Sequence, residues 1–161
     1  MDLEPGGIYR TLIERAIEVR QRAYAPYSGI HVGSAVESTA GNITVGCNIE
    51  CVTLSETSHA EQNAIVAMVT VGEHRIRRIA VAVAPRDIVF QMNGRRPRRR
   101  LSVRDVPPSC GHCLQIIWEF SGDNPLVELV FATPDGGVYR TTMGAVLPLP
   151  FKIDLPGGTK V

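Results

Sequence analysis

The chain has 161 residues, of which 44% are hydrophobic and 20% charged, and its formal net charge is +1. This length suits one well-buried domain, so we expect a single domain over 1–161 with a loose tail at about 152–161. The balanced charge excludes a general attraction to nucleic acid or anionic lipid. No apolar run reaches the roughly 18 residues of a membrane-spanning helix and no signal peptide is recognisable, so the predicted location is cytoplasmic and no membrane partner is expected.

The spacing of apolar residues predicts, in chain order, a helix, a hairpin of two strands, a helix, a strand, a helix and two strands. These elements span about 5–23, 30–38, 43–49, 60–71, 78–84, 114–120, 126–132 and 138–142. The apolar run at 78–84 is typical of a buried central strand. This order predicts an α/β fold, with a mixed sheet that carries packed helices.

Two short segments carry the chemistry. His59 and Glu61 are two residues apart, Cys110 follows fifty-one residues after His59, and Cys113 lies three residues after Cys110. A His-x-Glu motif followed by Cys-x-x-Cys is the signature of zinc deaminases, in which the glutamate is the acid/base and binds no metal. We therefore predict that His59, Cys110 and Cys113 bind Zn²⁺ and that Glu61 is catalytic.

The predicted elements support a shared site. Each motif begins a helix just after a loop, so both can direct side chains to one point, and positive helix ends stabilise the thiolates that bind metal. Three protein ligands leave the fourth tetrahedral position for water, as a catalytic zinc requires.

Other interpretations of the same residues are open. Ser58 and Glu61 form the pattern of a helix capping box, with Ser58 as the cap. Cys110 and Cys113 are also compatible with buried thiols or a redox pair. A closed four-cysteine structural zinc site would add Cys47 and Cys51, but it leaves His59 and Glu61 unexplained.

The sequence resembles the cytidine deaminase family along nearly its whole length. The similar segments are 23–28 with 32–35, Gly46-Cys47-Asn48-Ile49-Glu50, His59-Ala60-Glu61-Gln62, 110–115, and Leu147-Pro148 with Phe151. The resemblance implies a three-layer α/β/α sandwich that uses Zn²⁺ to convert a cytosine nucleoside to its uracil form with release of ammonia. It also implies a homotetramer in which neighbouring subunits share active sites.

The resemblance assigns further substrate-binding residues. Asn48 and Glu50 are expected to hydrogen-bond the sugar hydroxyls, and the backbone around Ala60 is expected to contact the base edge. Phe151 matches an aromatic residue that packs against the nucleoside. Ile30 stands where the family usually has an aromatic residue, which removes a stacking surface.

Other departures concern the substrate. Residues 51–57 differ from the usual family pattern, Ser109 replaces the proline that normally precedes the first cysteine, and 85–108 is longer than expected. Blasticidin S deaminase is a relative that acts on a decorated cytosine nucleoside, so a modified cytosine nucleoside or another aminated heterocycle is the alternative substrate.

Five arginines lie within residues 95–100. Such a run is suited to phosphate, a substrate carboxylate or a nucleic acid backbone, whereas the plainer interpretation is a solvated loop. The near-neutral overall charge and the lack of an aromatic stacking platform argue against a polynucleotide deaminase. A non-catalytic zinc-binding module is the remaining alternative, disfavoured because every zinc and acid/base residue is present.

Overall fold

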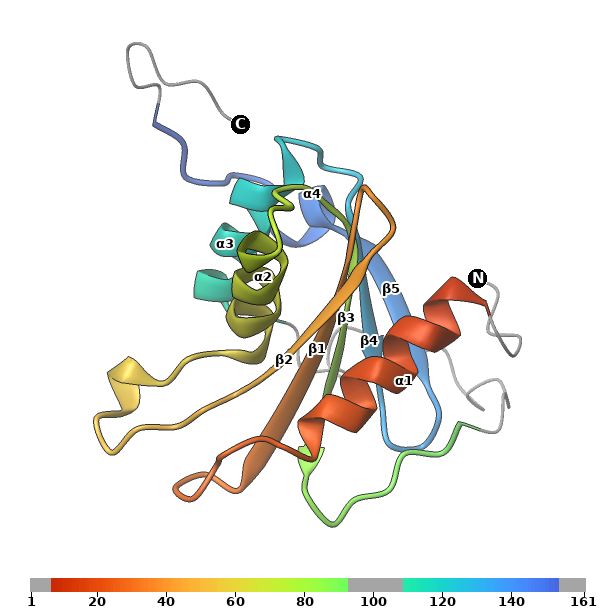
Figure 1. Cartoon of the computed structure of the whole chain (residues 1–161), viewed down its shortest axis with the longest axis vertical. Helices are drawn as coiled ribbons and strands as arrows, with labels where there is room; N and C mark the ends of the chain where they lie inside the picture. Colours follow the sequence, from red (N-terminus) through yellow and green to blue (C-terminus); the bar gives the residue numbers. More distant parts are fainter. Residues whose placement is uncertain (1–6, 93–108, 154–161) are drawn as a thin grey trace.

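The computed structural model describes residues 7–92 and 109–153 (Figure 1). The elements are α1 (Ile8–Arg20), β1 (Ile30–Ser38), β2 (Ile43–Cys47), the 3-10 helix η1 (Leu54–Glu56), α2 (Ala60–Thr70), β3 (Ile76–Pro85), α3 (Gly111–Ser121), β4 (Glu128–Ala132), β5 (Val138–Thr142) and α4 (Met143–Val146). The arginines at 95–100 and the predicted tail beyond 153 lie outside the described residues.

The five strands form one mixed sheet in the order β2-β1-β3-β4-β5. Among the four pairings of these described strands, that of β3 with β4 is parallel and the other three are antiparallel. Helix α1 covers one face of the sheet, and α2 and α3 cover the other (Figure 1). The predicted α/β/α sandwich is therefore confirmed.

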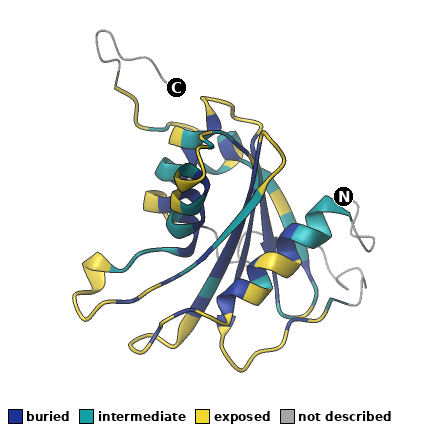
Figure 2. Cartoon of the chain, viewed as in Figure 1, coloured by how far each residue is buried: buried dark blue, intermediate teal, exposed yellow. Residues whose placement is uncertain are grey.

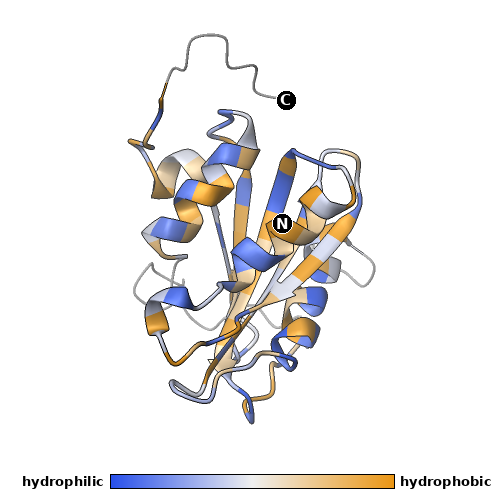
Figure 3. Ribbon diagram, turned by 60° about the vertical axis from the view of Figure 1, so that its left-hand side comes forward, coloured by the Kyte–Doolittle hydropathy of each residue, from blue (hydrophilic) through white to orange (hydrophobic). Residues whose placement is uncertain are grey.

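The side chains of the central strand β3 point alternately into two separate hydrophobic cores. Ile79 and Val81 point into the core beneath α2 and α3, whereas Ala80 and Ala82 point into the core beneath α1. Side chains along a strand alternate between faces, so a strand covered on both sides is apolar at every position. Figure 2 shows this region buried, and Figure 3 shows orange, apolar stretches along the strands between the helices.

The predicted hairpin is present, with Gly41 in the left-handed region at φ 92°. Strand β2 ends at Cys47, two residues earlier than predicted. The side chain of Asn48 explains this end, because its Oδ1 accepts from Val32 N–H at 2.8 Å and its Nδ2 donates to Ile30 O at 3.0 Å. The backbone N–H of Asn48 still donates to the carbonyl of Val32 at 3.2 Å, but the Asn48 side chain takes the place of its backbone carbonyl as the acceptor.

Two short elements were not predicted from the sequence. Both η1 and α4 are too short for a periodic pattern to develop. Residues 48–58, which include η1, project away from the sheet (Figure 1). Within the described residues, no helix is long and apolar enough to cross a membrane.

Candidate active site and metal centre

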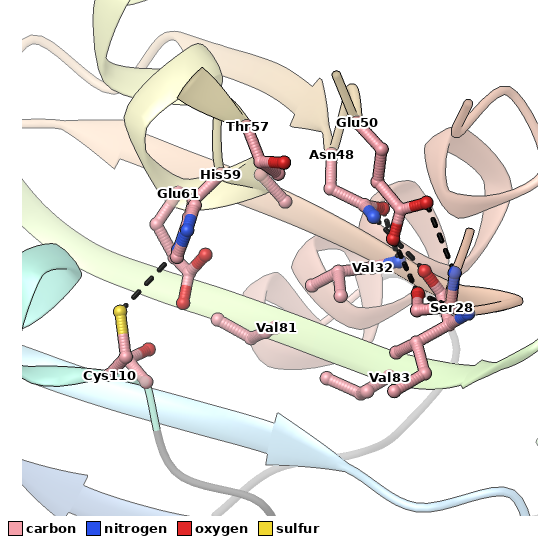
Figure 4. A pocket seen from close by; sticks show the side chains of 13 residues that line it. Ser28, Val32, Asn48, Glu50, Thr57, His59, Glu61, Val81, Val83 and Cys110 are labelled. Atoms are coloured by element: carbon pink, nitrogen blue, oxygen red, sulfur yellow. Dashed lines mark hydrogen bonds between the residues drawn. The ribbon is translucent and has the colours of Figure 1, made fainter. Parts of the chain in front are cut away.

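A cavity of about 280 Å³ opens beside the N-terminus of α2, over the strands β1 and β3 (Figure 4). Its lining residues come from five separate stretches of the chain. They are Ser28, Ile30, Val32, Asn48, Glu50, Thr57, His59, Ala60, Glu61, Val81, Val83, Ser109 and Cys110. The sheet thus supplies an apolar floor, while loops and helix N-termini supply polar groups at the ends.

The structure brings together the three residues predicted to bind zinc. His59 Nδ1 lies 3.4 Å from Cys110 Sγ and 3.2 Å from Cys113 Sγ, and all three donor atoms lie within 4.8 Å of one another. Tetrahedral zinc with bonds of about 2.0 Å to nitrogen and about 2.3 Å to sulfur places such atoms about 3.5 Å apart. The three side chains therefore fit a zinc ion.

The ligands sit at the starts of two helices, because His59 is the N-cap of α2 and Cys110 is the N-cap of α3. The expectation that Ser58 caps α2 with Glu61 is wrong by one position. Gln62 Oε1 accepts from the His59 N–H at 3.5 Å, and the Ser58 hydroxyl accepts from Asn63 Nδ2 at 3.0 Å. The Glu61 carboxylate therefore takes no part in capping the helix.

The charge balance of this site favours a cation. Burial raises the pKa of the Cys113 thiol, and the negative charges of Glu61 and Cys110 raise it further. A thiolate is the form of cysteine that binds metal, so a divalent cation here compensates both the lost hydration and the like charges. The positive ends of α2 and α3 act in the same direction.

Glu61 lies in the first turn of α2 with its side chain 5% exposed. Its carboxylate lines the cavity beside His59 and Cys110 (Figure 4), and its negative charge helps to raise the pKa of the Cys113 thiol. It is therefore adjacent to the metal ligands and open to a bound molecule, as an acid/base residue has to be.

Glu50 lies at the other end of the cavity (Figure 4). Its Oε2 accepts from the backbone N–H groups of Tyr27 at 2.9 Å and Ser28 at 3.3 Å, and its Oε1 accepts from the Ser28 hydroxyl. The Ser28 hydrogen bond is the main reason that the pKa of Glu50 lies below its ordinary value. The ionised carboxylate is an acceptor only, so it suits a ligand that presents hydroxyl donors.

Asn48 lies next to Glu50 and is buried. Its two hydrogen bonds to β1, described above, use the carbonyl oxygen and one of the two amide protons. One N–H is left to donate into the cavity, because an amide nitrogen carries two protons. Asn48 thus both holds the start of β1 and faces the ligand space.

The walls between these two ends are aliphatic. Ile30, Val32, Val81 and Val83 line the cavity, and no phenylalanine, tyrosine or tryptophan is among its lining residues in the described part of the chain. Ile30 remains 49% exposed, so the replacement of the usual aromatic residue leaves one wall open. The loss of a stacking surface at this position stays a prediction.

Phe151 does not line the cavity of its own chain. Its backbone N–H donates to Gln115 Oε1 at 3.0 Å and its carbonyl oxygen accepts from Gln115 Nε2 at 3.0 Å, while the ring is 69% exposed. The contact of this ring with a nucleoside stays a prediction.

Cys47 and Cys51 do not join the metal-binding cluster. Among the described residues the cluster contains only His59, Cys110 and Cys113, whereas Cys51 is exposed and Cys47 is partly buried. Burial raises the pKa of Cys47, which disfavours its thiolate. The four-cysteine alternative has no support in this geometry.

Sequence reasoning gave no role to several residues that line the cavity. Ser28, Thr57, Val81 and Val83 all face it, and Ser109 was noted only as a departure from the family. The valines look like ordinary core positions in sequence. A clue to Ser28 was available, because it lies in a loop segment that resembles the family, but only the fold places it against Glu50.

This fold and this site define a class of protein. A His/Cys/Cys cluster with a buried glutamate at the start of one helix, on a mixed five-stranded sheet, is the arrangement of the zinc-dependent deaminases.

The comparisons agree on the family. The family model described as "Cytidine and deoxycytidylate deaminase zinc-binding region" matches residues 8–128. The cytidine deaminase of Sporosarcina psychrophila is 32% identical over 137 residues, or 85% of this chain and 86% of the relative. That of Halalkalibacterium halodurans is 30% identical over 137 residues, or 85% and 89%.

Solved structures give the same result. The crystal structure of cytidine deaminase from Burkholderia pseudomallei superposes with a TM-score of 0.72 and 28% identity, covering 90% of this chain and 100% of that one. The chain belongs to the cytidine and deoxycytidylate deaminase family. It is a hydrolytic deaminase that acts on a C–N bond and uses zinc.

Proposed function

We propose that this enzyme hydrolyses the exocyclic amine of a cytosine nucleoside, giving the uracil nucleoside and ammonia. One observation carries the proposal: a single cavity has the zinc ligands and Glu61 at one end and the hydroxyl acceptor Glu50 at the other. A cytosine nucleoside has a reactive amine on its base and hydroxyl groups on its sugar, so its two ends match the two ends of the cavity. The similarity to named cytidine deaminases supports the same substrate.

In this proposal His59, Cys110 and Cys113 would hold the zinc ion, which when bound would lower the pKa of a water molecule toward neutrality. The Glu61 carboxylate accepts a proton from the attacking water as its oxygen adds to C4 of the base. Glu61 delivers this proton to ring N3, then takes the second water proton from the hydroxyl group now on C4 and delivers it to the amine as the C4–N bond breaks. One water is thus consumed and one ammonia is released.

At the other end, Glu50 accepts a hydrogen bond from a sugar hydroxyl and the remaining N–H of Asn48 donates one. The backbone around Ala60, at the first turn of α2, contacts the edge of the base. Ile30 packs against the base without stacking on it. These assignments rest on the lining of the cavity and on the family resemblance.

A modified cytosine nucleoside, such as blasticidin S, is the second candidate substrate. The half-exposed Ile30 favours it, because an aliphatic wall with an open side accepts a bulkier ligand than an aromatic wall does. Ile30→Phe is expected to raise kcat/KM for cytidine and to lower it for the bulkier substrate. Equal effects on both substrates would argue against a role of Ile30 in substrate choice.

We further propose a homotetramer of single-domain subunits with shared active sites. Exposed apolar side chains on the projecting loop and near the C-terminus, Val52, Leu54 and Phe151, support burial against other chains. Light scattering after size exclusion tests the assembly. A monomer with full activity would contradict it. The cytoplasmic location remains a prediction from the sequence.

A substrate panel tests the proposed reaction most directly. Ammonia release is measured with the zinc-loaded enzyme on cytidine, deoxycytidine, free cytosine, blasticidin S and other aminated heterocycles. We expect turnover of a cytosine nucleoside and weaker turnover of free cytosine, which lacks the sugar. Activity on none of them would contradict the proposal and favour a binding module. Salt-dependent binding of single-stranded RNA or DNA would favour a polynucleotide deaminase.

A further inference from the structure

Ser109 combines two features that no other lining residue of the cavity shares. Its side chain is 6% exposed, and its Oγ has no hydrogen-bond partner within the described part of the chain. The same residue lines the cavity next to Cys110. Leaving a buried hydroxyl unpaired destabilises a fold, so buried polar groups in proteins nearly always have partners.

The position of Ser109 limits what its partner is. It directly precedes the N-cap of α3 and lies at the zinc end of the cavity, with His59 and Glu61. His59 and Cys110 are committed to the metal, and Glu61 is committed to proton transfer. Ser109 therefore supplies a hydroxyl at this end that is free for the reacting part of the substrate.

We infer that the Ser109 hydroxyl binds the exocyclic amino group of the base, accepting a hydrogen bond from its N–H. This inference rests on the proposed deamination of a cytosine nucleoside. The amine is attached to the carbon that is attacked, so it has to lie at the zinc end, within reach of a hydroxyl there. The Oγ atom is itself buried in this structure, so the contact requires the side chain to turn about its Cα–Cβ bond toward the cavity. Relatives with proline at this position have no side-chain hydroxyl to make this contact.

The test uses the zinc-loaded full chain with Ser109→Ala. Without substrate the variant is expected to be more stable, with a melting temperature higher by about 2 to 4 °C, because an unpaired buried hydroxyl has been removed. Its kcat/KM for cytidine is expected to fall about 5- to 10-fold, because the hydrogen bond to the amine is lost. Ser109→Thr keeps a hydroxyl and is expected to retain most of the activity.

Ser34 provides the matched control. It is also fully buried with an unpaired Oγ among the described residues, but it lies in β1 and does not line the cavity. Ser34→Ala is expected to raise the melting temperature in the same way and to leave kcat/KM unchanged. A gain in stability combined with a loss of activity is thus specific to Ser109.

The other outcomes are decisive as well. If wild type deaminates cytidine and Ser109→Ala does so equally well, the inference about Ser109 is wrong while the proposed function stands. If Ser109→Ala is less stable than wild type, or if Ser109→Thr loses as much activity as Ser109→Ala, the hydroxyl has a structural role and the inference is also wrong. If wild type is inactive on every cytosine nucleoside, the proposed function fails and this inference fails with it.

Discussion

The Ser28 hydroxyl donates a hydrogen bond to Oε1 of Glu50, and the same oxygen of Ser28 accepts from the Ile30 N–H at 3.0 Å. Ser28 thereby joins the loop before β1 to the carboxylate at the sugar end of the cavity. The bond holds Glu50 ionised and fixes its orientation, so we regard Ser28 as a positioning residue for substrate binding.

Ser28→Ala is expected to raise KM for cytidine about 10-fold or more with little change in kcat, because hydrogen bonds to charged groups are among the stronger ones. The control is 2′,3′-dideoxycytidine, which lacks the hydroxyl groups that Glu50 would bind. Wild type and variant are expected to use this analogue with nearly equal kcat/KM. An equal loss on both substrates would mean that the substitution damages the fold.

The same hydrogen bond predicts a pH dependence of stability. The pKa of Glu50 is lowered in the folded state, so the group contributes stability above the ordinary carboxyl pKa of about 4.3. That contribution is lost as the pH falls from this value through the lowered pKa. Ser28→Ala removes the largest cause of the shift, so its unfolding free energy is expected to fall less steeply over this range. Urea unfolding at several acidic pH values measures both slopes.

The roles of Glu61 and His59 are separable by metal analysis. Glu61→Gln is expected to retain one zinc per chain and to lose about 10²- to 10⁴-fold in kcat, because the acid/base group is gone and the ligands remain. His59→Ala is expected to lose the zinc, because only two ligands are left. Zinc content and ammonia release are measured on the same samples. A fully active Glu61→Gln enzyme would disprove the proposed role.

Cys47 and Cys51 lie outside the metal-binding cluster, so their removal is expected to leave zinc content unchanged. Cys47→Ser and Cys51→Ser are compared with Cys110→Ser, which is expected to lose zinc. Loss of zinc from Cys47→Ser or Cys51→Ser would instead support the four-cysteine structural site.

Gly46 lets β2 pack tightly against the start of α2. A Cβ atom at this position would lie 2.3 Å from the backbone nitrogen of Ala64 and 2.6 Å from the carbonyl oxygen of Ala60. Gly46→Ala is expected to destabilise the fold by about 1–3 kcal/mol or more, because the obstacle is backbone, which cannot rotate away. It is also expected to weaken zinc binding, since the same helix presents His59.

Gly111 is the control for this substitution. A Cβ atom there meets nothing within 4 Å, although the residue lies between two zinc ligands. Gly111→Ala is expected to leave the melting temperature unchanged or slightly higher, because alanine has the better helix propensity. If both glycine variants were equally stable, close packing at Gly46 would not be what holds α2 in place.

Local sequence patterns were enough to predict most of the fold. The alternation and length of apolar runs located β1 and β5 at their observed bounds, and the other predicted strands and helices within two or three residues at most ends. These features depend on which face of an element is apolar, which neighbouring residues determine. The end of β2 was missed because it depends on a side-chain bond from Asn48 to a different strand.

The sequence by itself determined the reaction class, because His59, Glu61, Cys110 and Cys113 carry the required chemistry in a specific spacing. Only the tertiary structure decided how the cavity is lined. Ser28, Val81 and Ser109 come from a loop, a strand and a helix start, and each has a plainer explanation in its local sequence. Their shared role arises when the sheet brings them to one cavity, which is a consequence of long-range packing.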